Sequence, residues 1–137
     1  MRVLTALPVD EIKDHEDGRV DLLGLREDWF FDQVPVLLER LTVFVELEIA
    51  PADRGRKHTL VFQVAEEGGK VLKAVPVSFG IPPDYPRPIA PLDPTLFEIP
   101  FERFGPHALD IFIGNDGPPY DHARRVYLSI QPRENDL

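Results

Sequence analysis

The stretch 41-LTVFVELEI-49 decides the fold, because its apolar residues recur at every second position. One face of this stretch carries Leu41, Val43, Val45, Leu47 and Ile49. The opposite face carries Thr42, Phe44, Glu46 and Glu48. A repeat of two is the side-chain period of a β-strand, whereas a helix repeats every 3.6 residues. The sequence therefore predicts a strand with one face in a hydrophobic core.

The same alternation appears in seven further stretches, separated by turn residues such as Asp17-Gly18 and Glu67-Gly68-Gly69-Lys70. We expect strands at 2–9, 19–25, 41–49, 58–65, 71–79, 95–101, 109–113 and 126–130. Besides the first row, the residues expected to face inward are Leu60, Phe62, Val64, Val71, Val75, Val77, Phe79, Leu109, Ile111, Ile113, Val126, Leu128 and Ile130. Many short strands joined by tight turns favour an all-β, antiparallel two-sheet sandwich of about eight strands.

Helix is expected in one place at most. The stretch Arg26–Gln33 predicts one or two helical turns, with Asp28 as the N-cap and Pro35 ending the helix.

The segment 81–100 contains seven prolines in twenty residues. Proline lacks the N–H that a central strand donates, so this segment cannot be a central strand. Strand patterns on both sides indicate an extended crossover between the sheets inside one domain, 1–137, and a length of 137 residues suits a single domain.

Composition limits the classes of function. The chain has no cysteine, so disulfides and thiolate chemistry are excluded. Its net charge of −9 opposes binding to nucleic acid or to an anionic membrane surface. No apolar run approaches the roughly 18 residues of a membrane span, so we expect a cytoplasmic protein. Few Asn and Gln, one Met and 15 Pro favour a thermophilic source.

Catalytic and cofactor motifs are lacking. Ser78 and Ser129 do not sit in a nucleophile elbow, and Gly68-Gly69 is a turn without the spacing of a phosphate-binding loop. We therefore expect no cofactor. A metal site remains an alternative if loops at one end of the sandwich converge, because hard cations want several carboxylates. Its candidate ligands are Asp116, Asp121, His122, Asp14 and Asp17, although solvated turn acids explain the same pattern.

Apolar residues on the nominally outer faces are the strongest functional signal. Phe44, Val61, Leu72, Phe112 and Tyr127 alternate out of phase with the inward rows. Trp29, Phe30 and Phe31 are consecutive, so they cannot all point into one core. These outer residues predict either internal cover or contact with another chain. The candidate interface residues are Trp29, Phe30, Phe31, Phe44, Phe112 and Tyr127.

Several sequence segments, taken in order along the chain, resemble those of a family of uncharacterised bacterial proteins. They are the first strand ending at Asp10, then 18-GRVDLLGL-25, the entry at Pro35, the hairpin 67-EGGKVL-72 and 104-FGPHAL-109. The last phrase departs from the family's usual glycine–small/basic–tyrosine opening of that strand. The resemblance implies an immunoglobulin-like β-sandwich and no assigned activity, and it carries over no functional residues.

Two hypotheses about function follow. The first is a non-catalytic binding or protein-interaction module, with a homodimer as one form of that interaction. The second is an enzyme or metal-binding protein with a site built from the acidic and histidine loops.

Overall fold

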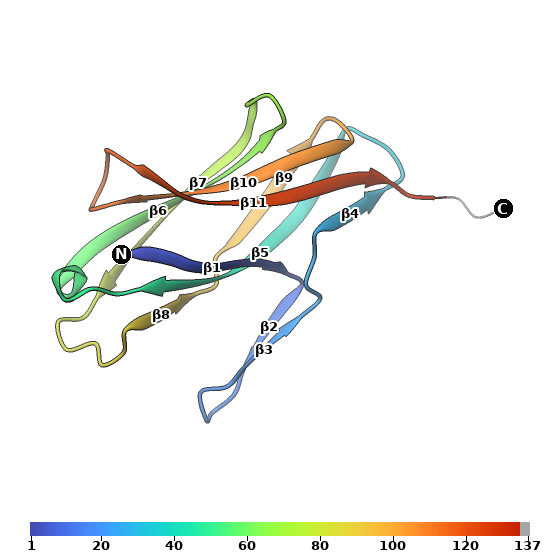
Figure 1. The fold of residues 1–137 in the computed structure, drawn as a ribbon. Coiled ribbons are helices and arrows are strands. Elements are labelled where there is room, and N and C mark those ends of the chain that lie inside the picture. The colour runs from blue at the N-terminus through green and yellow to red at the C-terminus, as the bar shows by residue number, and fades with distance from the viewer. Residues whose placement is uncertain (135–137) are drawn as a thin grey trace.

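The computed structural model describes residues 1–134, and within them the chain forms eleven strands and one 3-10 turn (Figure 1). The first five strands are β1 (Arg2–Val9), β2 (Glu11–Asp14), β3 (Val20–Leu23), β4 (Asp28–Phe31) and β5 (Val36–Glu48). After the 3-10 turn η1 (Pro51–Asp53) come β6 (Arg56–Glu66), β7 (Val71–Ile81), β8 (Ile89–Leu92), β9 (Thr95–Phe101), β10 (Gly105–Gly114) and β11 (Asp121–Pro132).

The strands form two facing sheets and a small hairpin (Figure 1). One sheet has the order β1-β5-β8, with β9 also paired to β5, and the other has the order β4-β11-β10-β6-β7. Strands β2 and β3 make a separate hairpin that projects from the sandwich. Every pair is antiparallel except β4 with β11. The predicted all-β sandwich is confirmed, and all eight predicted strands are present, together with β2, β4 and β8.

The core lies between the two sheets and follows the predicted alternation. Leu41, Val43, Val45, Leu47 and Ile49 are all buried on β5 and the residue after it. Leu60, Phe62 and Val64 on β6 face them, together with Leu109 and Ile111 on β10 and Leu128 and Ile130 on β11. Burial of these side chains is the main stabilising contribution to the fold.

The predicted helix at Arg26–Gln33 is wrong. Residues Asp28–Phe31 form strand β4, which pairs in parallel with Ser129–Pro132 of β11. Asp28 is not a helix cap, because its carboxylate accepts a hydrogen bond from the Gln131 side chain at 3.0 Å. A partner about 100 residues away in sequence therefore determines the structure of this segment.

The predicted facing of Val71 and Leu72 is reversed. Leu72 packs against the core and Val71 is 47% exposed. The cause is a register shift between β6 and β7, where Val64 pairs with Lys73 but Ala65 pairs with Val71. A bulge of this kind moves the residues beyond it to the opposite face of the sheet.

The proline-rich segment leads from β7 of one sheet to β8 and β9 of the other. Both β8 and β9 pair only with β5, so each is an edge strand, where proline is tolerated. Across residues 1–134, no helix has the length and apolar character needed to cross a membrane.

Candidate binding groove

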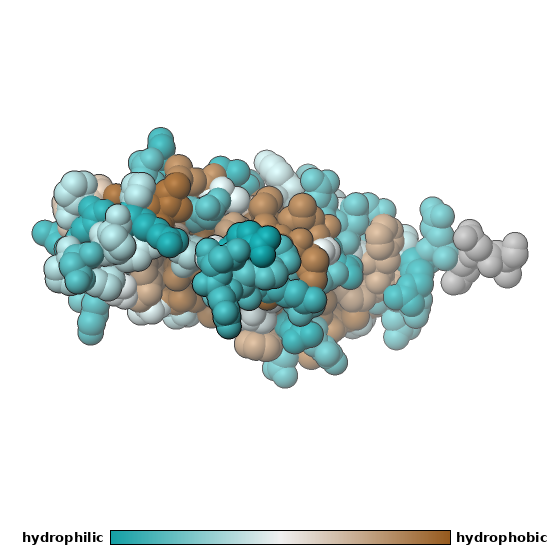
Figure 2. Space-filling view, turned by 90° about the horizontal axis from the view of Figure 1, so that it is seen from below, coloured by the Kyte–Doolittle hydropathy of each residue, from teal (hydrophilic) through white to brown (hydrophobic). Residues whose placement is uncertain are grey.

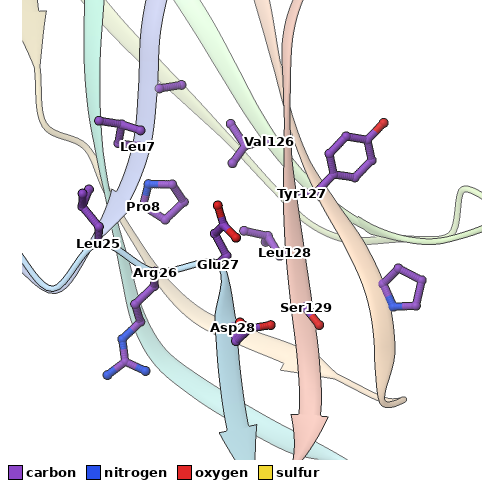
Figure 3. A pocket seen from close by; sticks show the side chains of 12 residues that line it. Leu7, Pro8, Leu25, Arg26, Glu27, Asp28, Val126, Tyr127, Leu128 and Ser129 are labelled. Atoms are coloured by element: carbon purple, nitrogen blue, oxygen red, sulfur yellow. The ribbon is translucent and has the colours of Figure 1, made fainter.

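An open groove runs between β1 and β11, which belong to opposite sheets (Figure 3). Its volume is about 780 Å³. The residues that line it are Ala6, Leu7, Pro8, Leu25, Arg26, Glu27, Asp28, Pro106, Val126, Tyr127, Leu128 and Ser129. The groove therefore lies where the sandwich is open between an edge strand of one sheet and the penultimate strand of the other.

One end of the groove is closed by the chain that leads into β4. The Arg26 N–H donates to the Pro8 carbonyl of β1 at 3.0 Å. One residue later, the Glu27 carbonyl accepts from the Ser129 N–H of β11 at 2.9 Å. Arg26 is also held by its side chain, since its Nε lies 2.6 Å from Asp10 Oδ1. This short segment thus bridges the two sheets and blocks the groove at that end.

Beyond this bridge, the outer edge of β11 pairs with no other strand among residues 1–134, although β1 of the opposite sheet runs close beside it. Strand β4 pairs with β11 only over Ser129–Pro132, and within residues 1–134 no strand pairs with that edge of β11 at residues 121–128. Because Ser129 directs its N–H toward β4, the two-residue alternation directs the N–H and C=O groups of Tyr127 and Arg125 to the same side. These backbone groups therefore have no strand partner. We call the space beside the unpaired edge of residues 122–127 of β11 the free lane.

Three other edge strands contain prolines inside the strand. Strand β7 contains Pro76, β8 contains Pro91 and β9 contains Pro100. Proline on an edge strand prevents the edge from pairing with another chain. Strand β1 has its one proline at Pro8 and β11 at its last residue, Pro132, so residues 2–7 of β1 and 121–131 of β11 contain none. Both edges that border the groove are thus free of proline over these residues, as is the short edge strand β4.

The groove has apolar walls and two carboxylates, of which Asp28 accepts a hydrogen bond from Gln131 and Glu27 does not. Val126 and Leu128 come from one side, Leu7 and Leu25 from the other, and Leu25 is 63% exposed. Glu27 points between β1 and β11 (Figure 3), and within the described chain it forms no ion pair. Seen from the side of the β2–β3 hairpin, apolar surface surrounds a hydrophilic cluster in front (Figure 2). Such a surface suits an extended, partly apolar ligand.

A buried acid supports β11 from the outer face of its sheet. The Asp110 carboxylate accepts hydrogen bonds from Arg125 Nε at 2.8 Å and from Arg125 Nη2 at 3.2 Å. It also lies 2.8 Å from His122 Nε2. Burial raises the pKa of Asp110, but the hydrogen bonds from Arg125 and His122 outweigh it and hold that pKa below its usual value. The cluster joins β10 to the strand whose edge is free.

The predicted metal ligands lie on two different hairpins. Asp14 ends β2 and Asp17 follows it in the β2–β3 turn, where Asp17 pairs with Arg19 at 2.7 Å. Asp116, Asp121 and His122 belong to the β10–β11 hairpin, and His122 contacts Asp110. Asp121 and His122 line a second depression of about 550 Å³ beside Arg2 and Val3. In the described part of the chain, no group of three His, Asp or Glu side chains is placed to hold a metal ion.

The predicted interface residues have different environments. Trp29, a candidate interface residue, is buried in the core, and the Phe31 ring packs with its centroid 6.5 Å from that of Phe101. Phe44 is half-buried and lines a shallow depression with Ile12 and Pro91, so the β2–β3 hairpin and the proline-rich segment cover it from inside the chain.

Phe112 is half-buried and stacks edge-on against His122, with ring centroids 5.3 Å apart. Phe30 and Tyr127 remain open to solvent, at 48% and 72% exposure. The Tyr127 ring points away from the groove, while the Tyr127 backbone borders it (Figure 3).

The groove is not apparent from the sequence. Tyr127 stands out in the sequence by its side chain, whereas no pattern marks Leu7, Leu25 or Glu27. One signal was available: prolines occur in the strands at 71–81, 89–92 and 95–101 but not in the stretch 121–131. The difference in proline content points to an open edge only when the structure shows which strands lie at the edges of the sheets.

The fold and the groove define an all-β sandwich domain with an exposed strand edge next to an apolar cleft. The chain belongs to the DUF6941 family, a family of unknown function, whose model matches residues 5–118. The matched range includes residues 5–9 of β1 and the bridge at Arg26–Glu27 but ends before β11. No curated protein and no solved structure matches the chain.

Proposed function

We propose that this protein is a non-catalytic binding module that accepts a short extended segment of another polypeptide beside β11. The segment would form main-chain hydrogen bonds with Arg125 and Tyr127 and would place alternate side chains on the apolar walls of the groove. The observation that carries this proposal is the unpaired edge of β11, free of proline and adjacent to an apolar cleft.

A second copy of this chain is the other occupant considered for this edge. An antiparallel β11–β11 pair centred on Val126 would bring residues 121–124 of one copy beside the edge of residues 128–131 of the other. That edge is already occupied by Glu27 and β4. A symmetric pair through β11 is therefore confined to residues 122–127 of each copy, the same stretch that a short segment would use.

The proposal extends to the type of β-sandwich, the cellular compartment and the source of the protein. We infer an immunoglobulin-like sandwich, because the order β11-β10-β6-β7 matches the G-F-C-C′ order of variable-type domains. One departure is β8, which pairs directly with β5. A cytoplasmic setting is supported by the absence of cysteine, a thermophilic source by composition, and a bacterial source by the family resemblance.

The variant Tyr127→Pro tests the role of the edge, with Tyr127→Thr as its matched control. Both substitutions remove the ring, but only proline removes the N–H that faces the groove. Proline is tolerated on an edge strand when its nitrogen faces solvent, so the domain should still fold. Thermal melts and the fluorescence of Trp29, the single tryptophan, check the fold of both variants.

The probe is an eight-residue peptide of alternating valine and threonine with a dye at its C-terminus, measured by fluorescence anisotropy. We expect the peptide to bind the wild type and Tyr127→Thr, and to bind Tyr127→Pro at least about tenfold more weakly. The proline variant loses one main-chain hydrogen bond, and its pyrrolidine ring obstructs the edge. Equal binding to both variants would overturn the proposal. Sizing at micromolar concentration tests the other occupant: a dimer abolished by Tyr127→Pro would assign the edge to a second copy.

A further inference from the structure

We propose that the bound segment is the free N-terminus of a partner polypeptide, lying antiparallel to β11 with its ammonium group at Glu27. This inference rests on the proposed binding function and specifies which part of a partner the groove receives. Its basis is the combination of a closed end, an unpaired carboxylate at that end and a cation at the other.

The closed end favours a chain terminus. A strand beside β11 can pair with residues up to Tyr127, where it meets the bridge formed by Arg26 and Glu27. The bridge is hydrogen-bonded to both sheets, so a continuing chain would have to turn sharply out of the groove at this point. A chain that ends there needs no turn. The free stretch 122–127 is six residues long, which corresponds to about 20 Å of extended strand.

The charge at the closed end selects the amino terminus. The two neighbours of Glu27 are already engaged, Arg26 with Asp10 and Asp28 with the Gln131 amide. The Glu27 side chain points into the groove, and among residues 1–134 it forms neither an ion pair nor a side-chain hydrogen bond. An ammonium group would gain a charge-assisted hydrogen bond there, whereas a terminal carboxylate would be repelled.

The charge at the other end agrees with this direction. Arg124 is exposed on β11 and forms no ion pair within the described residues. Its positive charge disfavours an ammonium group at the open end and favours an acidic side chain about four residues into the segment. With the N-terminus beside Tyr127 and the chain running toward His122, the segment is antiparallel to β11. The net charge of −9 also attracts a cationic terminus.

The test compares three forms of the valine–threonine peptide on the full chain. The first has a free amine, the second is N-acetylated, and the third is acetylated but ends in a free carboxylate with the dye on a side chain. We expect acetylation to weaken binding about tenfold, the scale of one charge-assisted hydrogen bond at a partly exposed site. The carboxylate peptide should bind no better than the acetylated one.

Glu27→Gln identifies the group responsible, and Glu39→Gln is its control because Glu39 is exposed on β5 and does not line the groove. With Glu27→Gln, the free-amine peptide should fall to the affinity of the acetylated peptide, which itself should be unchanged. Equal binding of the amine and acetylated peptides to the wild type would overturn this inference and leave the proposed function standing. If no peptide binds, the proposed function itself fails.

Discussion

Asp110 and Arg125 face each other across β10 and β11 and share two hydrogen bonds on the outer side of the sheet. The Asp110 side chain is 6% exposed and that of Arg125 is 51% exposed, so a nearly buried acid is covered by a half-exposed base. Arg125 is also one of the two residues whose backbone borders the free lane. The stability of the pair and the shape of the binding edge are therefore linked.

The first prediction concerns this pair at neutral pH. Asp110→Asn should lower the free energy of unfolding by about 1–2 kcal/mol, because it weakens hydrogen bonds to charged partners that are themselves half-exposed. Urea unfolding at pH 7 measures the change. Asp93→Asn, an exposed site, should change stability by less than about 0.5 kcal/mol. Equal effects at the two sites would show that the Asp110 pair contributes nothing specific.

The second prediction concerns acid. The pKa of Asp110 is lowered in the folded protein, so its ionised form stabilises the fold above the ordinary carboxyl value of 3.8. That contribution is lost as the pH falls through the lowered pKa. The stability difference between wild type and Asp110→Asn should therefore stay constant from pH 7 to about pH 5 and shrink below about pH 4. A difference that grows on acidification would contradict the direction of the shift.

The third prediction tests the core that the alternating pattern identified. Phe62 is fully buried on β6, whereas Phe97 on β9 is 59% exposed. Phe62→Ala should cost about 3–5 kcal/mol, since it removes buried apolar surface and leaves a cavity. Phe97→Ala should cost less than about 0.5 kcal/mol. Denaturant unfolding of both variants measures this, and similar losses would mean that the sheet faces are assigned wrongly.

The main strands could be predicted because their information is local. In Leu41–Ile49 each residue's facing follows from its neighbours, so the alternation alone identifies strand and core face. The bulge opposite Val71 could not be predicted, because it depends on how β7 pairs with β6. Strand β4 was missed for a related reason: Asp28–Phe31 has no alternation of its own and is a strand only because β11 lies beside it.

The groove could not be predicted because it is a property of unpaired edges. The sequence shows that Tyr127 lies in a strand, but not that β4 stops pairing with β11 at Ser129. Glu27 had no motif around it, and its significance comes from the bridge that its carbonyl makes to Ser129. The predicted metal ligands failed to meet for the same kind of reason, since Asp14 and Asp121 belong to hairpins that the topology separates.

The last prediction concerns Gly24, which lies two residues before Arg26 at the start of the segment that bridges the two sheets. Gly24 has a φ of +69°, and a Cβ at this position would collide with the side chain of Asp10, which holds Arg26. Gly18 has a φ of +88° but open space around its Cβ position, so it is a matched control. Gly18→Ala should cost about 1 kcal/mol for the left-handed backbone alone.

Gly24→Ala should cost roughly 1 kcal/mol more than Gly18→Ala, because Asp10 must move away from Arg26. Denaturant unfolding of the two variants gives the difference. Since Arg26 and Glu27 close the groove together, Gly24→Ala should also weaken binding of the free-amine peptide, whereas Gly18→Ala should leave that binding unchanged. If Gly24→Ala and Gly18→Ala lose the same stability and bind the peptide equally, the Asp10–Arg26 pair does not position the bridge.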